Sequence, residues 1–256
     1  MKISILFLRQ LQSYKISIQK SRQLAYNLPS YKKTIISQYC SHNYKGGKIV
    51  SKALLGKLFK SDKNKKIFCH YTDPHAIRVL SNKFSLLLGE LNSPQGRPLI
   101  VVGIGTDRST GDSLGPLVGT RLSEIRAKNL HVYGTLDEPV HASNLKEKLQ
   151  LINEMHDNPL MVAVDASLGR NSSIGNITLS PGSLKPGAGV NKELPEVGEI
   201  HFTGVVNVGG FMEYFVLQNT RLNLVFKMAH KIAISIFYGH KLALAQDIKA
   251  DKTLSV

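Results

Sequence analysis

The chain has few cysteines and no long apolar run, and these two absences exclude several classes of protein. Its two cysteines, Cys40 and Cys69, do not form a CxxC pair. A disulfide framework and a cysteine-rich zinc site are therefore excluded, and a reduced cytoplasmic protein is favoured. No stretch reaches the roughly 18–20 unbroken apolar residues that span a bilayer, and the best, Ile232 to Tyr238, is far too short. We expect no membrane partner.

Acidic residues are missing from the first 49 positions, which hold nine Lys and Arg. These residues supply +9 of the formal charge of +15, a total that would otherwise suggest a nucleic acid or an acidic membrane surface as partner. The segment also lacks a sustained helical or strand period. It is open to three interpretations: a basic disordered arm that binds nucleic acid, an organelle transit peptide, or a stretch that is not natively translated.

We favour the last interpretation. Lys45-Gly46-Gly47 can be back-translated as AAAGGAGGA, which contains a bacterial ribosome-binding sequence a few nucleotides before Val50, and the valine codon GTG is a common alternative start. The expected organisation is a basic segment over 1–49, disordered or not natively translated, a basic lead-in over 50–70, and a single α/β domain over 71–250. For that domain we expect no nucleic-acid partner.

Periodicity within the domain alternates between strands and helices. Continuous apolar runs at 98–105 and 160–164 are typical of parallel strands that are covered on both faces. Helical spacing of apolar residues predicts helices from Thr72 to about Leu91, from Ser113 to about Lys128, and from Ser143 to Met155. Further strands are predicted over 131–136, 175–180 and 200–208. A Gly- and Pro-rich loop is expected over 181–198, and a helical stretch broken near Asn219 over 211–244.

This alternation predicts an α/β fold with three layers, in which a mostly parallel sheet has helices on both faces. Ligands of such sheets gather beyond the carboxyl ends of the strands. Asp112 is expected just before a helix and Asp165 at the end of a buried strand, so both carboxylates should reach that edge. The simpler interpretation makes Asp112 a helix N-cap and Asp165 a partner of loop amides. Two carboxylates brought close share a proton, activate water or hold a metal.

Other candidates around this edge are weaker. Glycines at 103, 105 and 111 do not match GxGxxG, and no Lys-Ser/Thr ending makes a P-loop. Neither Ser113 nor Ser167 lies in a GxSxG elbow, which argues against a serine hydrolase. Asp107 and Arg108 either pair with each other or form a solvated turn. His201 is a candidate third ligand or base, although a single histidine in a strand is more often structural.

Two long segments resemble the signatures of the YyaC family of sporulation proteins. They are Gly105-Thr-Asp-Arg-Ser-Thr-Gly-Asp-Ser-Leu-Gly-Pro-Leu-Val-Gly119 and Val206-Asn-Val-Gly-Gly-Phe-Met-Glu-Tyr-Phe-Val-Leu-Gln-Asn-Thr-Arg221. The resemblance covers roughly Tyr71 to Lys241. That family is similar to the germination protease that degrades small acid-soluble spore proteins, and more distantly to the hydrogenase maturation proteases. The resemblance therefore implies a germination-protease or maturation-protease type of fold.

The resemblance extends to the site. Gly111-Asp112-Ser113-Leu114-Gly115-Pro116 is similar to the Pro-Asp-Ala-Leu-Gly-Pro segment of the germination protease, and Asp165-Ala166 is similar to its second Asp-Ala. Asp112 and Asp165 are thereby implied as the catalytic acids. A further similarity links the segment that starts at Pro186 to that protease's Pro-Gly-Ser-Gly-Val loop. We predict substrate contacts from residues in or beside these segments: Asp107, Arg108, Ser113, Pro186, Gly187 and Asn207.

The expected function is an aspartate-dependent peptidase of sporulation or spore germination, without a cofactor, in the cytoplasm of a spore-forming bacterium. Its expected substrate is a peptide or protein, with small acid-soluble spore proteins as candidates, and its oligomeric state is left open. One alternative is a non-catalytic sporulation factor that binds a peptide or protein partner. Another, implied by the maturation proteases, is a metal-dependent protease with Asp112, Asp165 and His201 as ligands.

Overall fold

The computed structural model of the chain describes residues 66–91, 97–187 and 194–254, with backbone only from 247 onward. The predicted basic segment 1–49, the Val50 start and most of the lead-in 50–70 lie outside these residues. Among the residues described, none of the helices combines the length and the apolar character needed to cross a membrane.

A six-stranded sheet forms the centre of the domain. Its strands lie in the order β1-β5-β6-β4-β2-β3. The four strands from β6 to β3 are mutually parallel, whereas β5 is antiparallel to both of its neighbours. The strand bounds are β1 Ile67–His70, β2 Leu99–Gly103, β3 Leu130–Tyr133, β4 Leu160–Gly169, β5 Asn176–Pro181 and β6 Ile200–Val208. The predicted mostly parallel sheet is confirmed.

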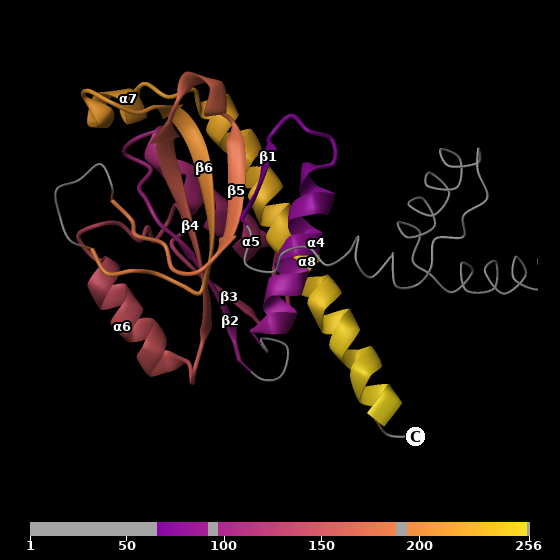
Figure 1. The fold of residues 1–256 in the computed structure, drawn as a ribbon. Helices are drawn as coiled ribbons and strands as arrows, with labels where there is room; N and C mark the ends of the chain where they lie inside the picture. Colours follow the sequence, from indigo (N-terminus) through magenta and orange to yellow (C-terminus); the bar gives the residue numbers. More distant parts are fainter. Residues whose placement is uncertain (1–65, 92–96, 188–193, 255–256) are drawn as a thin grey trace, which may run out of the picture. The chain divides into compact units, whose positions relative to one another are not determined.

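Helices cover both faces of this sheet (Figure 1). On one face, α4 (Ala76–Glu90), α5 (Leu114–Ile125) and α8 (Leu222–Leu254) enclose the larger hydrophobic cluster. The other face carries α6 (Leu145–Met155) and a smaller cluster. A short helix, α7 (Glu213–Gln218), follows the carboxyl end of β6. The three-layer arrangement predicted from the sequence is confirmed.

The central strand β2 explains why its sequence is apolar without alternation. Leu99 and Val101 belong to the cluster under α4, α5 and α8, whereas Ile100 and Val102 belong to the cluster under α6. Every residue of β2 is buried. Because both of its faces are covered, no position in the strand is available to a polar side chain.

The structure corrects three of the predicted boundaries. Strand β1 pairs with β5, so the domain begins before residue 71 and includes Ile67–His70. Helix α8 continues to Leu254, beyond the predicted helix end near Leu244 and the predicted domain end at 250. Strand β4 does not end at Asp165 but runs to Gly169, because β6 continues to pair with it after β2 has ended. Asp165 is therefore a mid-strand residue.

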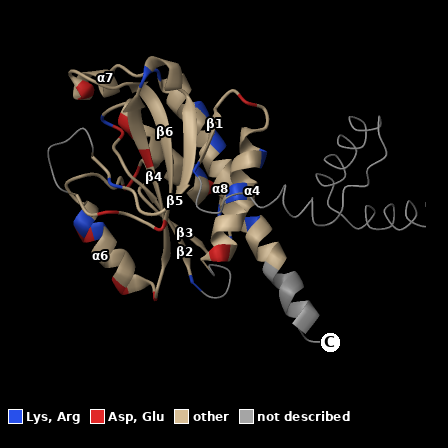
Figure 2. Ribbon diagram, viewed as in Figure 1, with Lys and Arg blue, Asp and Glu red and all other residues tan. Residues whose placement is uncertain are grey.

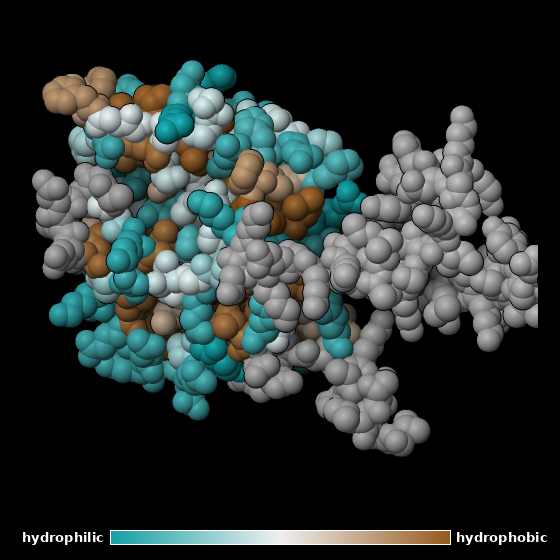
Figure 3. Space-filling view, viewed as in Figure 1, coloured by the Kyte–Doolittle hydropathy of each residue, from teal (hydrophilic) through white to brown (hydrophobic). Residues whose placement is uncertain are grey.

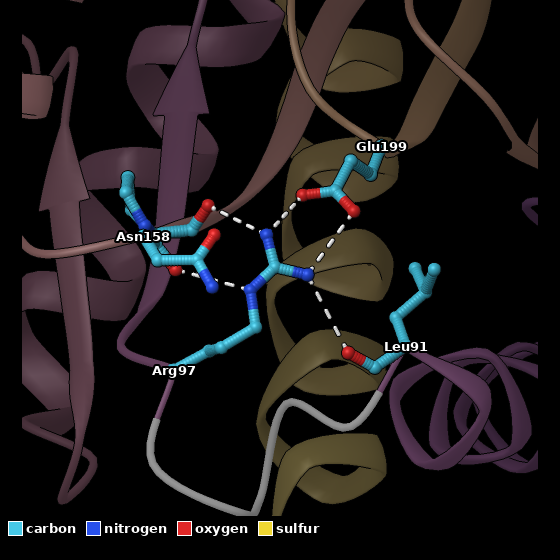
Figure 4. A network of polar contacts seen from close by, with 5 residues as sticks. Leu91, Arg97, Asn158 and Glu199 are labelled. Carbon is cyan, nitrogen blue, oxygen red and sulfur yellow. Dashed lines mark hydrogen bonds and ion pairs between the residues drawn. The ribbon is translucent and has the colours of Figure 1, made fainter.

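The amino ends of three strands are joined by Arg97, immediately before β2 (Figure 4). Its guanidinium donates to the carbonyl oxygens of Asn158 at 3.0 Å and Pro159 at 3.1 Å, just before β4. It also donates to both carboxylate oxygens of Glu199, just before β6. A fifth donation reaches the Leu91 carbonyl at 3.4 Å, at the end of α4. The planar fork of arginine suits this geometry, which a lysine does not reproduce.

We expect Arg97→Ala to lower the free energy of unfolding by about 1–2 kcal/mol, because a half-buried carboxylate and several carbonyls lose charge-assisted donors. Urea denaturation of the full chain measures this. Arg97→Lys should recover less than half of the loss. The matched control is Arg121→Ala, which removes an exposed pair with Glu124 and should change stability by less than about 0.5 kcal/mol. Equal effects of Arg97→Ala and Arg121→Ala would contradict the assignment.

Candidate active site

Asp112 is held at the carboxyl end of β2 by tight backbone packing. The chain leaves β2 through Gly105, which has a φ of +134°, and returns at the 3-10 turn Gly111–Ser113. A Cβ at Gly105 would lie 1.9 Å from the backbone oxygen of Asp112. The Thr106 N–H donates to that same oxygen at 3.2 Å. Asp112 does not cap α5, whose N-cap is Ser113 and makes no side-chain capping bond. Its carboxyl group is thus left for another role.

Asp165 lies in β4, directly opposite Thr203 of β6. On its other side β4 pairs with β2, whose last residue, Gly103, lies opposite Val164. Asp165 therefore has no partner in β2. The backbone N–H of Ala166 donates to the Asp165 carboxylate. Asp165 is the only acid in β4, and the red of acidic residues is visible within that strand in Figure 2. The sheet therefore delivers this side chain to the same edge as Asp112.

The two carboxyl groups interact electrostatically although they are far apart in the chain. Burial and, second, the charge of Asp112 raise the pKa of Asp165 to about 8. Burial also raises the pKa of Asp112, which the Thr106 N–H and the charge of His141 partly offset. Both residues keep part of their surface open to solvent. A pair of this kind shares a proton at neutral pH.

His141 is a third member of the site that the sequence analysis missed. It follows Val140, which forms a parallel bridge with Ile104 and accepts a hydrogen bond from the Gly105 N–H at 2.8 Å. The Asn144 side chain fixes this turn, since it accepts from the His141 N–H at 2.8 Å and donates to Pro139. The residue lies beyond the carboxyl end of β3. The rule that singled out Asp112 and Asp165 would have found it there.

The predicted metal alternative is not assembled. His201 lies opposite Ala163, which is two residues before Asp165 in β4. Its Nδ1 forms a hydrogen bond with the Gly182 carbonyl oxygen at 2.9 Å. Across the described parts of the chain, no three His, Cys, Asp or Glu side chains are grouped so that they could hold a metal ion. His201 is instead a structural link between β6 and the loop after β5.

A family model described as "Protein of unknown function (DUF1256)" matches residues 68–235. This chain belongs to the DUF1256 family. It is 53% identical over 178 residues to "Uncharacterized protein YyaC" of Bacillus subtilis (strain 168), across 70% of this chain and 85% of that protein. The resemblance to YyaC-type proteins is thereby confirmed.

The chain is also similar to solved structures. One of them is the crystal structure of a NiFe hydrogenase maturation protease, HycI, from Thermococcus kodakarensis KOD1. The match covers 59% of this chain and 98% of that chain, with 17% sequence identity and a TM-score of 0.37. The family match begins inside β1 and ends within α8, so it includes both Asp112 and Asp165.

Among the predicted substrate contacts, Asp107 and Arg108 are exposed in the loop that carries Asp112. The Arg108 N–H donates to the Thr106 hydroxyl, which in turn lies 3.4 Å from Asp107 Oδ1. The solvated turn is thus the arrangement found. Ser113 is buried, and its hydroxyl donates to the Thr110 carbonyl oxygen at 2.7 Å. It supports the loop from inside rather than facing a substrate.

The remaining three predicted contacts are not together: Pro186 and Gly187 follow β5, whose end pairs with the start of β6, whereas Asn207 lies near the end of β6. Pro186 is buried, and Gly187 is the last residue described before 188–193. Most of the predicted Pro-Gly loop lies in 188–193, outside the described residues. Asn207 uses its amide within the fold: Nδ2 donates to the Val216 carbonyl and the Thr220 hydroxyl, each at 3.2 Å, and Oδ1 accepts from the Val208 N–H. Its role is to position α7.

Gly105→Ala should destabilise the fold by at least about 3 kcal/mol, since the new Cβ meets the Asp112 backbone in addition to straining φ. Gly210 is a matched control with a φ of +141° and no atom within 4 Å of an added Cβ. Gly210→Ala should therefore show only the backbone strain, about 1–2 kcal/mol. Thermal and urea unfolding measure both variants, and equal losses would show that the contact with Asp112 is unimportant.

Ionisation of Asp165 should make stability depend on pH. Because its pKa is raised to about 8 in the folded state, the folded protein keeps a proton that the unfolded chain loses above about pH 4. The wild type therefore loses stability as the pH rises from about 4 to about 8. The free energy of unfolding of Asp165→Asn, relative to that of the wild type, should increase by roughly 2–4 kcal/mol from pH 4 to pH 9.

Urea denaturation at several pH values measures this gain. Asp157→Asn, which alters an exposed acid at the opposite end of the sheet, serves as the control and should show no such trend. A difference between Asp165→Asn and wild type that stays constant from pH 4 to pH 9 would refute the raised pKa.

Proposed function

We propose that this chain is an aspartate-dependent peptidase that acts in sporulation or spore germination. The observation that carries the proposal is the coupling of Asp112 and Asp165, through which one carboxyl group keeps its proton at neutral pH. Catalysis of hydrolysis needs a base and an acid in one place, and two carboxyl groups with separated pKa values provide both.

The proposed reaction uses each carboxyl group once. The Asp112 carboxylate accepts a proton from a water molecule as the water oxygen forms a bond to the peptide carbonyl carbon. Asp165 donates its proton to the peptide nitrogen as the C–N bond breaks, which releases an amine and a carboxylic acid. Asp112 then carries the proton and Asp165 the charge, and transfer of the proton back to Asp165 restores the resting state.

The biological setting of the proposal comes from the motif resemblance. The segments around Asp112 and Asp165 are similar to those of the germination protease, whose substrates are small acid-soluble spore proteins. These proteins, in the cytoplasm of a spore-forming bacterium, are the first substrates to test. The signature segment Gly105–Gly119 lies around Asp112, at the edge where the carboxyl pair is placed.

Asp112→Asn and Asp165→Asn should each lower the rate of cleavage of purified small acid-soluble spore proteins by about 10²-fold or more. Cleavage by the wild type should decline as the pH rises through about 8, where Asp165 loses its proton, and should be insensitive to a chelator. Gel electrophoresis and mass spectrometry of the products measure it. The control variant, Asp157→Asn, should cleave at the wild-type rate.

Three results would count against the peptidase. Full activity in both asparagine variants would remove the carboxyl pair from the reaction, and loss of activity with a chelator would favour the metal-dependent alternative. An absence of cleavage together with retained binding of the same proteins would favour the non-catalytic sporulation factor.

A further inference from the structure

The segment between β6 and α8 exposes large apolar side chains beside the carboxyl pair. Phe211 is 91% exposed and Tyr214 is 74% exposed, and Met212 and Phe215 are also exposed. We call residues 211–215 the aromatic segment. Its only charged residue, Glu213, is half-buried and accepts a hydrogen bond from the Gly210 N–H at 3.3 Å. The usual distribution is thus inverted, with the acid turned inward and the aromatic rings outward.

The surface around α7 shares this character. Figure 3 shows apolar surface at the top of the molecule, where Figure 1 places α7. Leu222 and Phe226, one turn apart at the start of α8, are more than half exposed as well. Several large exposed apolar side chains in one short stretch of a protein surface mark a place where another molecule binds.

The aromatic segment is anchored on both sides to the elements that carry the acids. Before it, the Gly209 N–H donates to the Gly169 carbonyl oxygen at 2.8 Å, at the end of β4. After it, Leu217 and Thr220 contact Gly111, where an added Cβ would meet their side chains at 2.7 and 2.9 Å. Gly111 immediately precedes Asp112. The segment therefore connects the end of the Asp165 strand to the Asp112 loop.

Strand β4 adds an open backbone edge at the same place. Its pairing with β2 ends at Val164, whereas its pairing with β6 continues to Gly169. The Val164 carbonyl accepts from the Ile104 N–H on the β2 side, so the Ala166 carbonyl faces that side too. The Ala166 N–H already donates to the Asp165 carboxylate, which leaves the carbonyl as the group that a bound chain can reach. Within the described residues no strand lies opposite Ala166 there. An extended chain is the ligand whose backbone pairs with such an edge.

We propose that the aromatic segment docks an extended, apolar stretch of a polypeptide, whose backbone lies along the open edge of β4 and so passes the carboxyl pair. The inference rests on the proposed peptidase function and names the part of the substrate that is recognised. Apolar side chains of the bound stretch would pack on Phe211, Tyr214 and Phe215. One of its backbone N–H groups would donate to the Ala166 carbonyl, next to Asp165.

Binding separates this proposal from catalysis. The probes are two fluorescein-labelled dodecapeptides of equal charge, one with Leu and Phe at alternate positions and one with Ser at those positions. Fluorescence polarisation with the full chain carrying Asp112→Asn, which should leave the peptide uncleaved, should show at least tenfold tighter binding of the apolar peptide. The added double substitution Phe211→Ser and Tyr214→Ser should remove that preference.

The matched control is Phe68→Ser, which replaces a 70% exposed aromatic residue of β1 and should leave the affinity unchanged. Two further peptides carry methyl groups on the backbone nitrogens of either the odd-numbered or the even-numbered residues. One of these two registers of methylation should weaken binding at least tenfold and the other should not. Equal binding of both registers would overturn the pairing with β4.

The remaining outcomes are decisive as well. Equal affinity of the double variant and its parent would overturn the docking surface. The docking surface would also be overturned if the parent sedimented as a dimer and the double variant as a monomer while both bound the peptide equally. The aromatic segment would then bind a second copy of the chain. Tight binding that depends on Phe211 and Tyr214, without cleavage by the wild type, would refute the peptidase while supporting the docking surface.

Discussion

Ionisation of Asp165 places a second negative charge beside Asp112, where protein replaces most of the water. The free-energy cost of that second charge is the constraint on which the rest of the site depends. It leaves the proton of Asp165 in place up to about pH 8. Proximity alone would not do this at an exposed surface, where water screens the charges. Glycine at position 105 lets the Asp112 backbone pack closely against the end of β2, the strand next to β4, and this packing contributes to the burial of the pair.

The two ends of the sheet consequently have opposite characters. At the amino end, the Arg97 guanidinium donates to a carboxylate and to three carbonyl oxygens. Charges of opposite sign therefore attract there and hold the strands together. At the carboxyl end, two like charges are brought together, a buried Ser109 hydroxyl has no described partner, and aromatic rings face solvent. An arrangement that reduces local stability is typical of a working site.

The sequence predicted those features that a local pattern encodes. The continuous apolar runs of β2 and the start of β4 indicated strands covered on both faces, and the bounds predicted for β6 agree with those found. It did not predict the pairing of β1 or the antiparallel direction of β5, because both depend on partners distant in the chain. The prediction that β4 ends at Asp165 was wrong for the same reason, since only β6 reveals that the strand continues. Asp165 was found because it directly follows an apolar run, and Asp112 because it lies between such a run and a helix. His141 was missed because β3, which precedes it, is not a continuous apolar run.

The aromatic segment and the carboxyl pair are physically connected if an apolar chain binds across both. Such a chain would exclude water from Asp112 and Asp165, and loss of water disfavours the doubly charged state further. Docking would therefore strengthen the retention of the single shared proton that the proposed hydrolysis requires. On this argument the exposure of Phe211 and Tyr214 and the raised pKa of Asp165 are two parts of one device, joined by the short path from Gly169 through α7 to Gly111.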